Sequence, residues 1–212
     1  FDLGYSLEKK RFSLTSSLYY RNSTGVISRV KEFYNNGTSA VTFMNIAQTK
    51  ALGFESVLMF KPIPTLRSTL SYNANYTWYI TNQASLPNRQ GFNHNVKWNT
   101  SYEFWKKTAT VQLSVNYNGQ RVTVQGIAQR QGPVDIAFEK KFSNGKWTVG
   151  TRVTDVFNKQ GFYFLVDRPG VQQVGEFKWL TRRVYVSAIY KFGKLEISNK
   201  AKGSGFEGGG DL

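Results

Sequence analysis

Cysteine is absent from this chain, and histidine occurs once, as His94. Without cysteine the chain has no disulfide, no thiolate nucleophile and no cysteine-bound metal. His94 falls on the apolar side of its segment, so we interpret it as an interfacial residue, and no histidine is left for a catalytic triad or a metal site. No glycine-rich phosphate loop follows a predicted strand either. We therefore predict a protein that is not an enzyme and that binds no metal or cofactor.

Long hydrophobic runs are also missing, because no window approaches 18 consecutive apolar residues. This absence excludes a transmembrane helix. It does not exclude a membrane barrel, whose strands are short and alternate between apolar and polar residues. Aromatic residues make up 16% of the chain, mostly as Phe and Tyr. Because these residues favour strands, the composition predicts an all-β fold.

Alternation of apolar and polar residues is clearest in "FNHNVKWNTSYEFW", residues 92–105. Successive side chains of a strand point to opposite faces, so this stretch has one apolar face and one polar face. The apolar face carries Phe92, Val96, Trp98, Tyr102 and Phe104. About nine alternating runs predict about nine strands. They cover residues 1–8, 11–33, 38–61, 66–81, 92–105, 108–124, 132–142, 146–157 and 181–192.

The predicted connections alternate between short and long. The short ones are "EKKR", "KPIPT", "WKKT" and "SNGK", and the long ones lie near 34–38, 82–91, 124–132 and 158–181. Short turns at one end and long loops at the other are typical of an outer-membrane barrel. Several runs also exceed the 9–11 residues that a tilted strand needs to cross a bilayer. We therefore predict an antiparallel transmembrane β-barrel.

Acidic residues are scarce, with 13 Asp and Glu against 28 Lys and Arg and a net charge of +15. Such a balance, together with many aromatic residues, can indicate a protein that binds nucleic acid. Here many of the cations are spread around the short turns, which predicts a basic rim near lipid headgroups and argues against nucleic acid. The rim consists of Lys9, Lys10, Arg11, Lys61, Lys106, Lys107, Lys140, Lys141 and Lys146.

The two faces of the predicted strands differ in composition. Aromatic residues near the ends of the apolar faces predict interfacial girdles, formed by Trp78, Phe92, Tyr102, Phe104, Trp147, Tyr190 and Phe192. The polar faces are rich in Asn, Ser, Thr and Gln. Their isolated charges are predicted to face the lumen or a plug, and these are Glu55, Lys97, Glu103, Asp135, Glu139 and Arg152.

Two local patterns complete the assignment of polar residues. Asp135 and Glu139 are four residues apart on a predicted strand, and so about 13 Å apart. This separation is too large for paired-carboxylate catalysis. The segment "DVFN", 155–158, is predicted to end a strand and begin a long loop, with Asp and Asn side chains bonding to nearby backbone.

Four stretches, in this order, resemble a known family. They are "LGYSLEKKRFSLTSSLYYRNSTGVI", "MNIAQTKALGFESVLMFKP", "GPVDIAFEKKFSNGKWTVGTRVTDVFN" and "RRVYVSAIYKFG". Residues 1–193 resemble the C-terminal barrel portion of a TonB-dependent outer-membrane receptor. The resemblance is to the outer-membrane β-barrel family often found behind a carboxypeptidase-like regulatory domain and a plug.

The resemblance implies that residues 1–193 form roughly the last nine strands of a barrel of about 22 strands. The opening "FDLGYSLEKK" already reads as a strand, so we expect a fragment or a processed chain. Nine strands alone would leave unpaired edges in lipid, which is not tolerated. The remainder of the barrel and the plug are therefore expected partners. Residues 194–212 form a polar, Gly-rich tail that we expect to be disordered.

The resemblance further implies energised nutrient uptake across the outer membrane of a Gram-negative bacterium. The expected partners are then outer-membrane lipid, the TonB complex acting through the plug, and surface lipoproteins or other complex subunits. A barrel subunit of a secretion or surface-assembly complex, without TonB, is an alternative. A soluble β-rich module that binds nucleic acid or glycan is a third possibility.

Ligand contacts are expected from the long loops and from the upper part of the lumen. The predicted ligand-binding residues are Tyr34, Asn35, Asn36, Arg89, Asn93, Arg130, Tyr163, Arg168 and Trp179. A wider set adds Asn82, Gln83 and Gln125. Each of these residues, taken alone, also fits an ordinary loop position.

Overall fold

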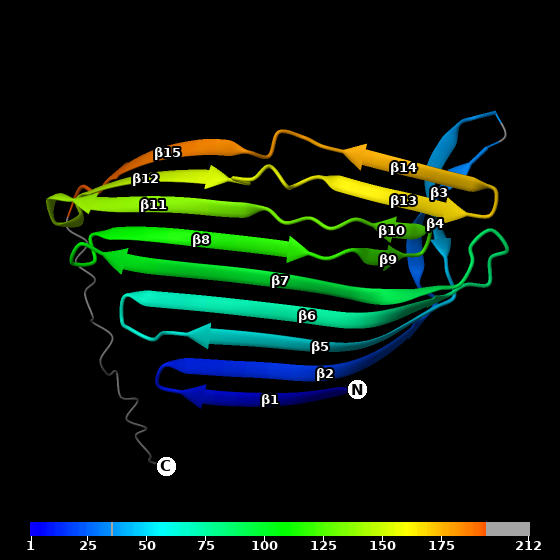
Figure 1. Cartoon of the computed structure of the whole chain (residues 1–212), viewed down its shortest axis with the longest axis horizontal. Coiled ribbons are helices and arrows are strands. Elements are labelled where there is room, and N and C mark those ends of the chain that lie inside the picture. Colours follow the sequence, from blue (N-terminus) through cyan, green and yellow to red (C-terminus); the bar gives the residue numbers. More distant parts are fainter. Residues whose placement is uncertain (35, 194–212) are drawn as a thin grey trace, which may run out of the picture.

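The computed structural model describes residues 1–34 and 36–193. The predicted tail, 194–212, and Asn35 lie outside these residues. Within them, nine strands form one wide antiparallel sheet in the order β1-β2-β5-β6-β7-β8-β11-β12-β15 (Figure 1). Their bounds are β1 Asp2–Lys9, β2 Phe12–Thr24, β5 Gln48–Phe60, β6 Leu66–Ile80, β7 Arg89–Phe104, β8 Ala109–Asn118, β11 Val134–Phe142, β12 Trp147–Thr154 and β15 Arg183–Tyr190.

The sheet is open in the described part of the chain, because β1 and β15 each pair on one side only. No helix of the described residues has the length and apolar character needed to cross a bilayer. The nine predicted main strands are therefore present as an all-β antiparallel sheet.

The short turns all lie at one end of the sheet, on the left in Figure 1. They join β1 to β2, β5 to β6, β7 to β8 and β11 to β12, as the sequence predicted. At this end the Lys140 ammonium group lies 4.5 Å from the centre of the Trp105 ring and donates a hydrogen bond to Thr108 Oγ1 at 2.7 Å. The predicted rim cations on the turns therefore share one end of the sheet, and Lys140 reaches it from the apolar face.

At the other end, the long connections fold into further strands. A two-stranded hairpin consists of β3 (Ile27–Phe33) and β4 (Ser39–Asn45). A four-stranded sheet has the order β14-β13-β10-β9. Its bounds are β9 Arg121–Thr123, β10 Gly126–Ala128, β13 Phe162–Arg168 and β14 Val171–Phe177. We call residues 25–47, 81–88, 119–133 and 155–182 the loop assembly.

These strands correct four sequence predictions. Residues 11–33 and 38–61 were each predicted as one strand, but the chain leaves the main sheet at Gly25 and returns at Ala47, both with positive φ. The amide of Gly25 donates to the Ala47 carbonyl oxygen at 2.7 Å and closes this branch point. Residues 108–124 break after Asn118 in the same way, and the predicted link 158–181 contains β13 and β14. The predicted runs extended across each branch point, so they did not locate these breaks.

The strand register separates the two faces of the main sheet. Tyr72 lies opposite Val96 on one face, and Asn73 lies opposite Asn95 on the other. Directly opposed residues of antiparallel strands share a face, so the pairing can be followed from strand to strand. It places all six residues predicted to face the lumen on the polar face: Glu55, Lys97, Glu103, Asp135, Glu139 and Arg152.

The apolar face of the main sheet is uncovered. Large apolar side chains there remain exposed, including Leu18 at 54%, Val184 at 69% and Val186 at 74%. Such an extended apolar surface is rare on a soluble monomer and marks contact with a partner or a membrane. The buried apolar cluster Val30, Ile46, Leu86 and Val124 instead belongs to the loop assembly.

The polar face is tightly packed at Gly53, which lies opposite Tyr19. A Cβ atom at Gly53 would lie 2.3 Å from Tyr19 Cζ, so the buried Tyr19 ring occupies the space that glycine leaves. We expect Gly53→Ala to displace this ring and lower the free energy of unfolding by about 1–3 kcal/mol. Urea unfolding of the intact protein in lipid vesicles measures the change.

Gly4→Ala is the matched control for Gly53→Ala. Gly4 also lies in a strand, and a Cβ atom there meets nothing within 4 Å. This substitution should change stability by less than about 0.5 kcal/mol. Equal losses in the two variants would show that the Tyr19 contact does not matter.

Candidate functional site

The loop assembly has its own apolar core. Val30 from β3, Ile46, Leu86 and Val124 are each at most 7% exposed, and Tyr79 of β6 packs against them. These residues come from three separate long connections and one main strand. The connections therefore pack on one another as a folded unit.

Polar contacts fix the hairpin against the four-stranded sheet. Gln125 accepts a hydrogen bond from the Lys31 backbone N–H at 2.7 Å and donates to the Lys31 carbonyl oxygen at 2.8 Å. The Gln125 amide thus bonds β3 as a neighbouring strand would. Lys31 Nζ also donates to Gln173 Oε1 at 2.8 Å. A separate ion pair of 3.3 Å, between Arg89 of β7 and Asp167 of β13, holds the four-stranded sheet to the main sheet.

A cavity of 530 Å³ lies between the hairpin and the four-stranded sheet. Its aromatic lining comes from Tyr79, Phe162, Phe164 and Phe177. Its basic lining comes from Arg29, Lys31 and Arg121, and no acidic residue of the described chain is among the lining residues. A concave, largely preformed site with a few polar groups is the usual form of a small-molecule site.

Below the loop assembly, the polar face carries connected side-chain amides. Asn73 donates to Glu55 Oε1 at 2.7 Å, Asn93 to Asn75 Oδ1 at 2.9 Å and Asn95 to Asn118 Oδ1 at 2.7 Å. Asn93 Oδ1 also accepts the Val122 backbone N–H at 2.9 Å, which ties this network to β9. The network forms a hydrogen-bonded surface that leads from the sheet up to the loop assembly.

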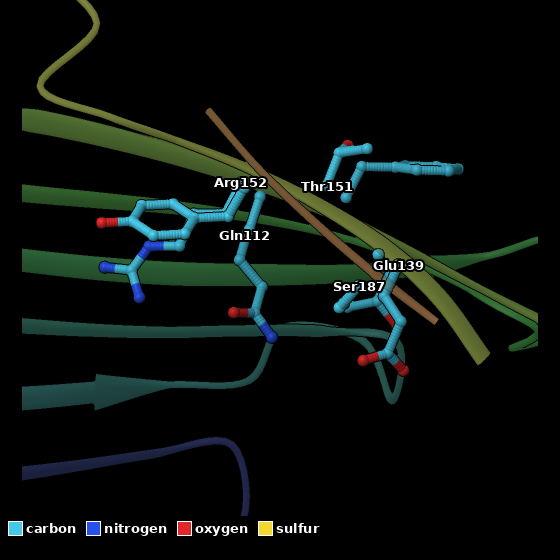
Figure 2. A pocket seen from close by; sticks show the side chains of 10 residues that line it. Gln112, Glu139, Thr151, Arg152 and Ser187 are labelled. Carbon is cyan, nitrogen blue, oxygen red and sulfur yellow. The ribbon is translucent and has the colours of Figure 1, made fainter. Parts of the chain in front are cut away.

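Nearer the short turns, the polar face has a shallow depression of 150 Å³. Figure 2 shows Gln112, Glu139 and Arg152 projecting from one side of the strands and Thr151 from the other. Arg152 Nη2 donates to Asp135 Oδ2 at 2.6 Å. A depression of this size holds a few water molecules, so we assign the ligand site to the larger cavity.

Residues 1–190 match the sequence profile of the outer membrane protein beta-barrel family. The chain belongs to this family. It is located in the outer membrane of a Gram-negative bacterium. No curated protein and no solved structure gives a significant match to the chain.

For an outer-membrane barrel, the geometry of the sheet sets its orientation. Such barrels have short periplasmic turns and longer extracellular loops. The loop assembly and its cavity therefore lie on the cell surface, and the basic rim lies at the periplasmic interface. The uncovered apolar face of the main sheet is the surface that contacts lipid. The polar face lies on the other side of the sheet and points away from lipid.

The residues predicted to bind ligand are spread over the main sheet and the loop assembly, and few of them line the cavity. Gln125, from the wider set, lines it. Arg89 is instead paired with Asp167, and Asn93 belongs to the amide network. The others belong to the loop assembly but lie outside the cavity lining, and they are Tyr34, Asn36, Arg130, Trp179 and, within β13, Tyr163. Only the backbone of Arg168 is described, in β13, and Asn35 lies outside the described residues.

Sequence reasoning missed the aromatic and basic residues of the cavity. Residues 162–166, "FYFLV", form a short run of aromatic and aliphatic residues, which is typical of a strand. This run lies inside the link near 158–181 that the sequence analysis predicts as a long loop. Arg29 and Arg121 carried no local signal, because only the folding of two distant connections brings them to one cavity.

Asp155 anchors the loop that follows β12. Its buried carboxylate accepts hydrogen bonds from the backbone N–H groups of Lys159 at 2.8 Å and Gln160 at 3.0 Å, and from the Thr181 hydroxyl. Burial raises the pKa of this carboxyl, but the hydrogen bonds and the nearby Lys178 charge outweigh it, so the pKa of Asp155 is lowered. The prediction that "DVFN" follows the end of a strand is confirmed, and so are the predicted backbone bonds of the Asp155 side chain. Among the described residues, the Asn158 side chain makes no such bond.

Proposed function

We propose that this chain is part of a TonB-dependent receptor and forms barrel wall and ligand-capturing surface for energised nutrient uptake. The observation that carries the proposal is the loop assembly, whose long connections pack together around a 530 Å³ cavity. A simple diffusion pore has no need for a concave site of this size on the cell surface. A receptor that collects a scarce solute does need one.

The edges of the main sheet support the same proposal. Lipid does not tolerate unpaired strand edges, so β1 and β15 must be completed by strands outside the described sheet. In a barrel of about 22 strands the lumen is wide and is filled by a plug. The polar face, with its amide network and isolated charges, is suited to contact such a plug. We propose that TonB acts through that plug and that the barrel performs no catalysis.

A genetic comparison tests the transport proposal. The gene for the intact protein, the gene for TonB, or both would be deleted in the parent bacterium. Growth of each strain would be measured on limiting nutrients. We expect both single deletions to give a growth defect on a shared nutrient, and the double deletion to be no worse there. Additive defects, together with co-purification of stable partner subunits, would support a secretion or surface-assembly subunit instead.

A further inference from the structure

We propose that the loop-assembly cavity binds a small organic anion with a planar aromatic part. This inference deepens the proposed function, because it names the ligand class of the same site. It is carried by two features of the cavity lining: its charge and its aromatic wall.

All the charged residues among the described lining residues are cations. Arg29, Lys31 and Arg121 contribute three cations, and the described lining residues include no Asp or Glu. Ion pairs within the described chain include those of Arg89, Lys141 and Arg152, and none of these pairs involves Arg29 or Arg121. The guanidinium groups of Arg29 and Arg121 therefore have no carboxylate partner there. Arginine is well suited to hold a carboxylate, sulfonate or phosphate through paired hydrogen bonds.

One wall of the cavity is aromatic, and the strand register places Arg121 on the same face of the four-stranded sheet as Phe164. Phe162 lies 5.5 Å from Phe164 and 6.5 Å from Phe177 between ring centres, and Phe164 and Phe177 are 6.1 Å apart and nearly parallel at 15°. Phe177 is 59% exposed, so this wall still has apolar surface to cover. A flat aromatic ligand would cover it by stacking.

A glycine shapes this wall. Gly175 lies opposite Phe164 in the β13–β14 pair, and a Cβ atom there would lie 2.2 Å from the Phe164 ring. The ring therefore lies against the backbone of β14 instead of filling the cavity. The remaining 530 Å³ falls within the range of small-molecule sites, which span about 300–1,000 Å³.

The test uses three probes on the detergent-solubilised intact protein. 2-Naphthoate has both the ring system and the charge, 2-naphthalenemethanol has the ring system only, and acetate has the charge only. Equilibrium dialysis gives each Kd. We expect naphthoate to bind at least about tenfold more tightly than either of the others, which is the size expected for one charge-assisted contact.

Two substitutions separate the two features. Arg121→Gln should weaken naphthoate about tenfold and leave naphthalenemethanol unchanged. Phe164→Ala should weaken both aromatic probes. Lys61→Gln makes the same charge change at the periplasmic end and should alter neither. If Arg121→Gln does not fold, added salt in the wild type should weaken naphthoate far more than naphthalenemethanol.

Equal binding of naphthoate and naphthalenemethanol by the wild type would overturn the inference. So would equal effects of Arg121→Gln and Lys61→Gln. These outcomes leave the transport proposal standing if the growth defect still depends on TonB. Conversely, a growth defect that is independent of TonB would overturn transport while naphthoate binding stays intact.

Discussion

An arginine in place of Trp98 is expected to lower the free energy of unfolding by about 2–4 kcal/mol, whereas an arginine in place of Asn99 should be tolerated. Trp98 lies on the lipid face, opposite Leu70 on β6 and Val115 on β8. It lies well inside β7, where a charged side chain would be placed in the hydrocarbon region of the bilayer. Asn99 is the next residue and lies on the polar face, where it accepts a hydrogen bond from Ser114 at 2.7 Å.

Urea titration of the intact protein in lipid vesicles, followed by the electrophoretic shift between folded and unfolded forms, measures both variants without relying on the Trp98 fluorescence. Trp98→Leu is the control for lost packing, because it removes the ring and its hydrogen bond to Ser68 without adding charge. Its loss should be well below that of the arginine variant. Equal tolerance of arginine at both positions would show that the two faces of β7 have been assigned to the wrong media.

Asp155→Ala should lower the free energy of unfolding by about 2–4 kcal/mol, because it leaves two backbone donors and the buried Thr181 hydroxyl without their shared acceptor. Asp155 also has a positive φ of 45°, which Asp and Asn adopt more readily than Ala. The loss should be concentrated in residues 155–182. Hydrogen exchange of the intact protein in detergent would show faster exchange there, with the short-turn end of β12 unchanged.

Asp155→Asn separates the acceptor from the charge. It keeps one side-chain oxygen and the tolerance for positive φ, so about half of the loss should return. The contribution of Asp155 also depends on pH. Because its pKa is lowered in the folded protein, the contribution should be constant above about pH 5, and shrink below about pH 4 as the carboxyl becomes protonated. Equal stability of Asp155→Ala and the wild type at pH 7 would contradict this role.

The main sheet was predictable because its signal is local and repeated. Each strand alternates, each short turn carries Lys, Gly or Pro, and β7 shows the pattern almost without interruption. The register then follows from turn length, so Lys97 and Glu139 could be assigned to one face from sequence. The total number of strands in the barrel stays a prediction.

The loop assembly was not predictable to the same degree, for a physical reason. Its strands are short, and β9 and β10 each span three residues, too few to show a period. Their pairing depends on contacts between segments far apart in the chain, such as Lys31 with Gln125. Gln125 was recognised as a candidate because it is a polar residue in a long loop, but its role as a bridge between hairpin and sheet is a tertiary property.

The apolar core of the loop assembly also constrains the order in which the protein can mature. Val30, Leu86 and Val124 are separated by main strands that cross the sheet between them. They can meet only after β5, β6, β7 and β8 are threaded and their outer ends stand on the same side of the bilayer. Contacts between such distant segments form late, because chain closure must precede them. The cavity is thus a product of completed insertion, and a barrel arrested midway would display its surface segments without a functional binding site.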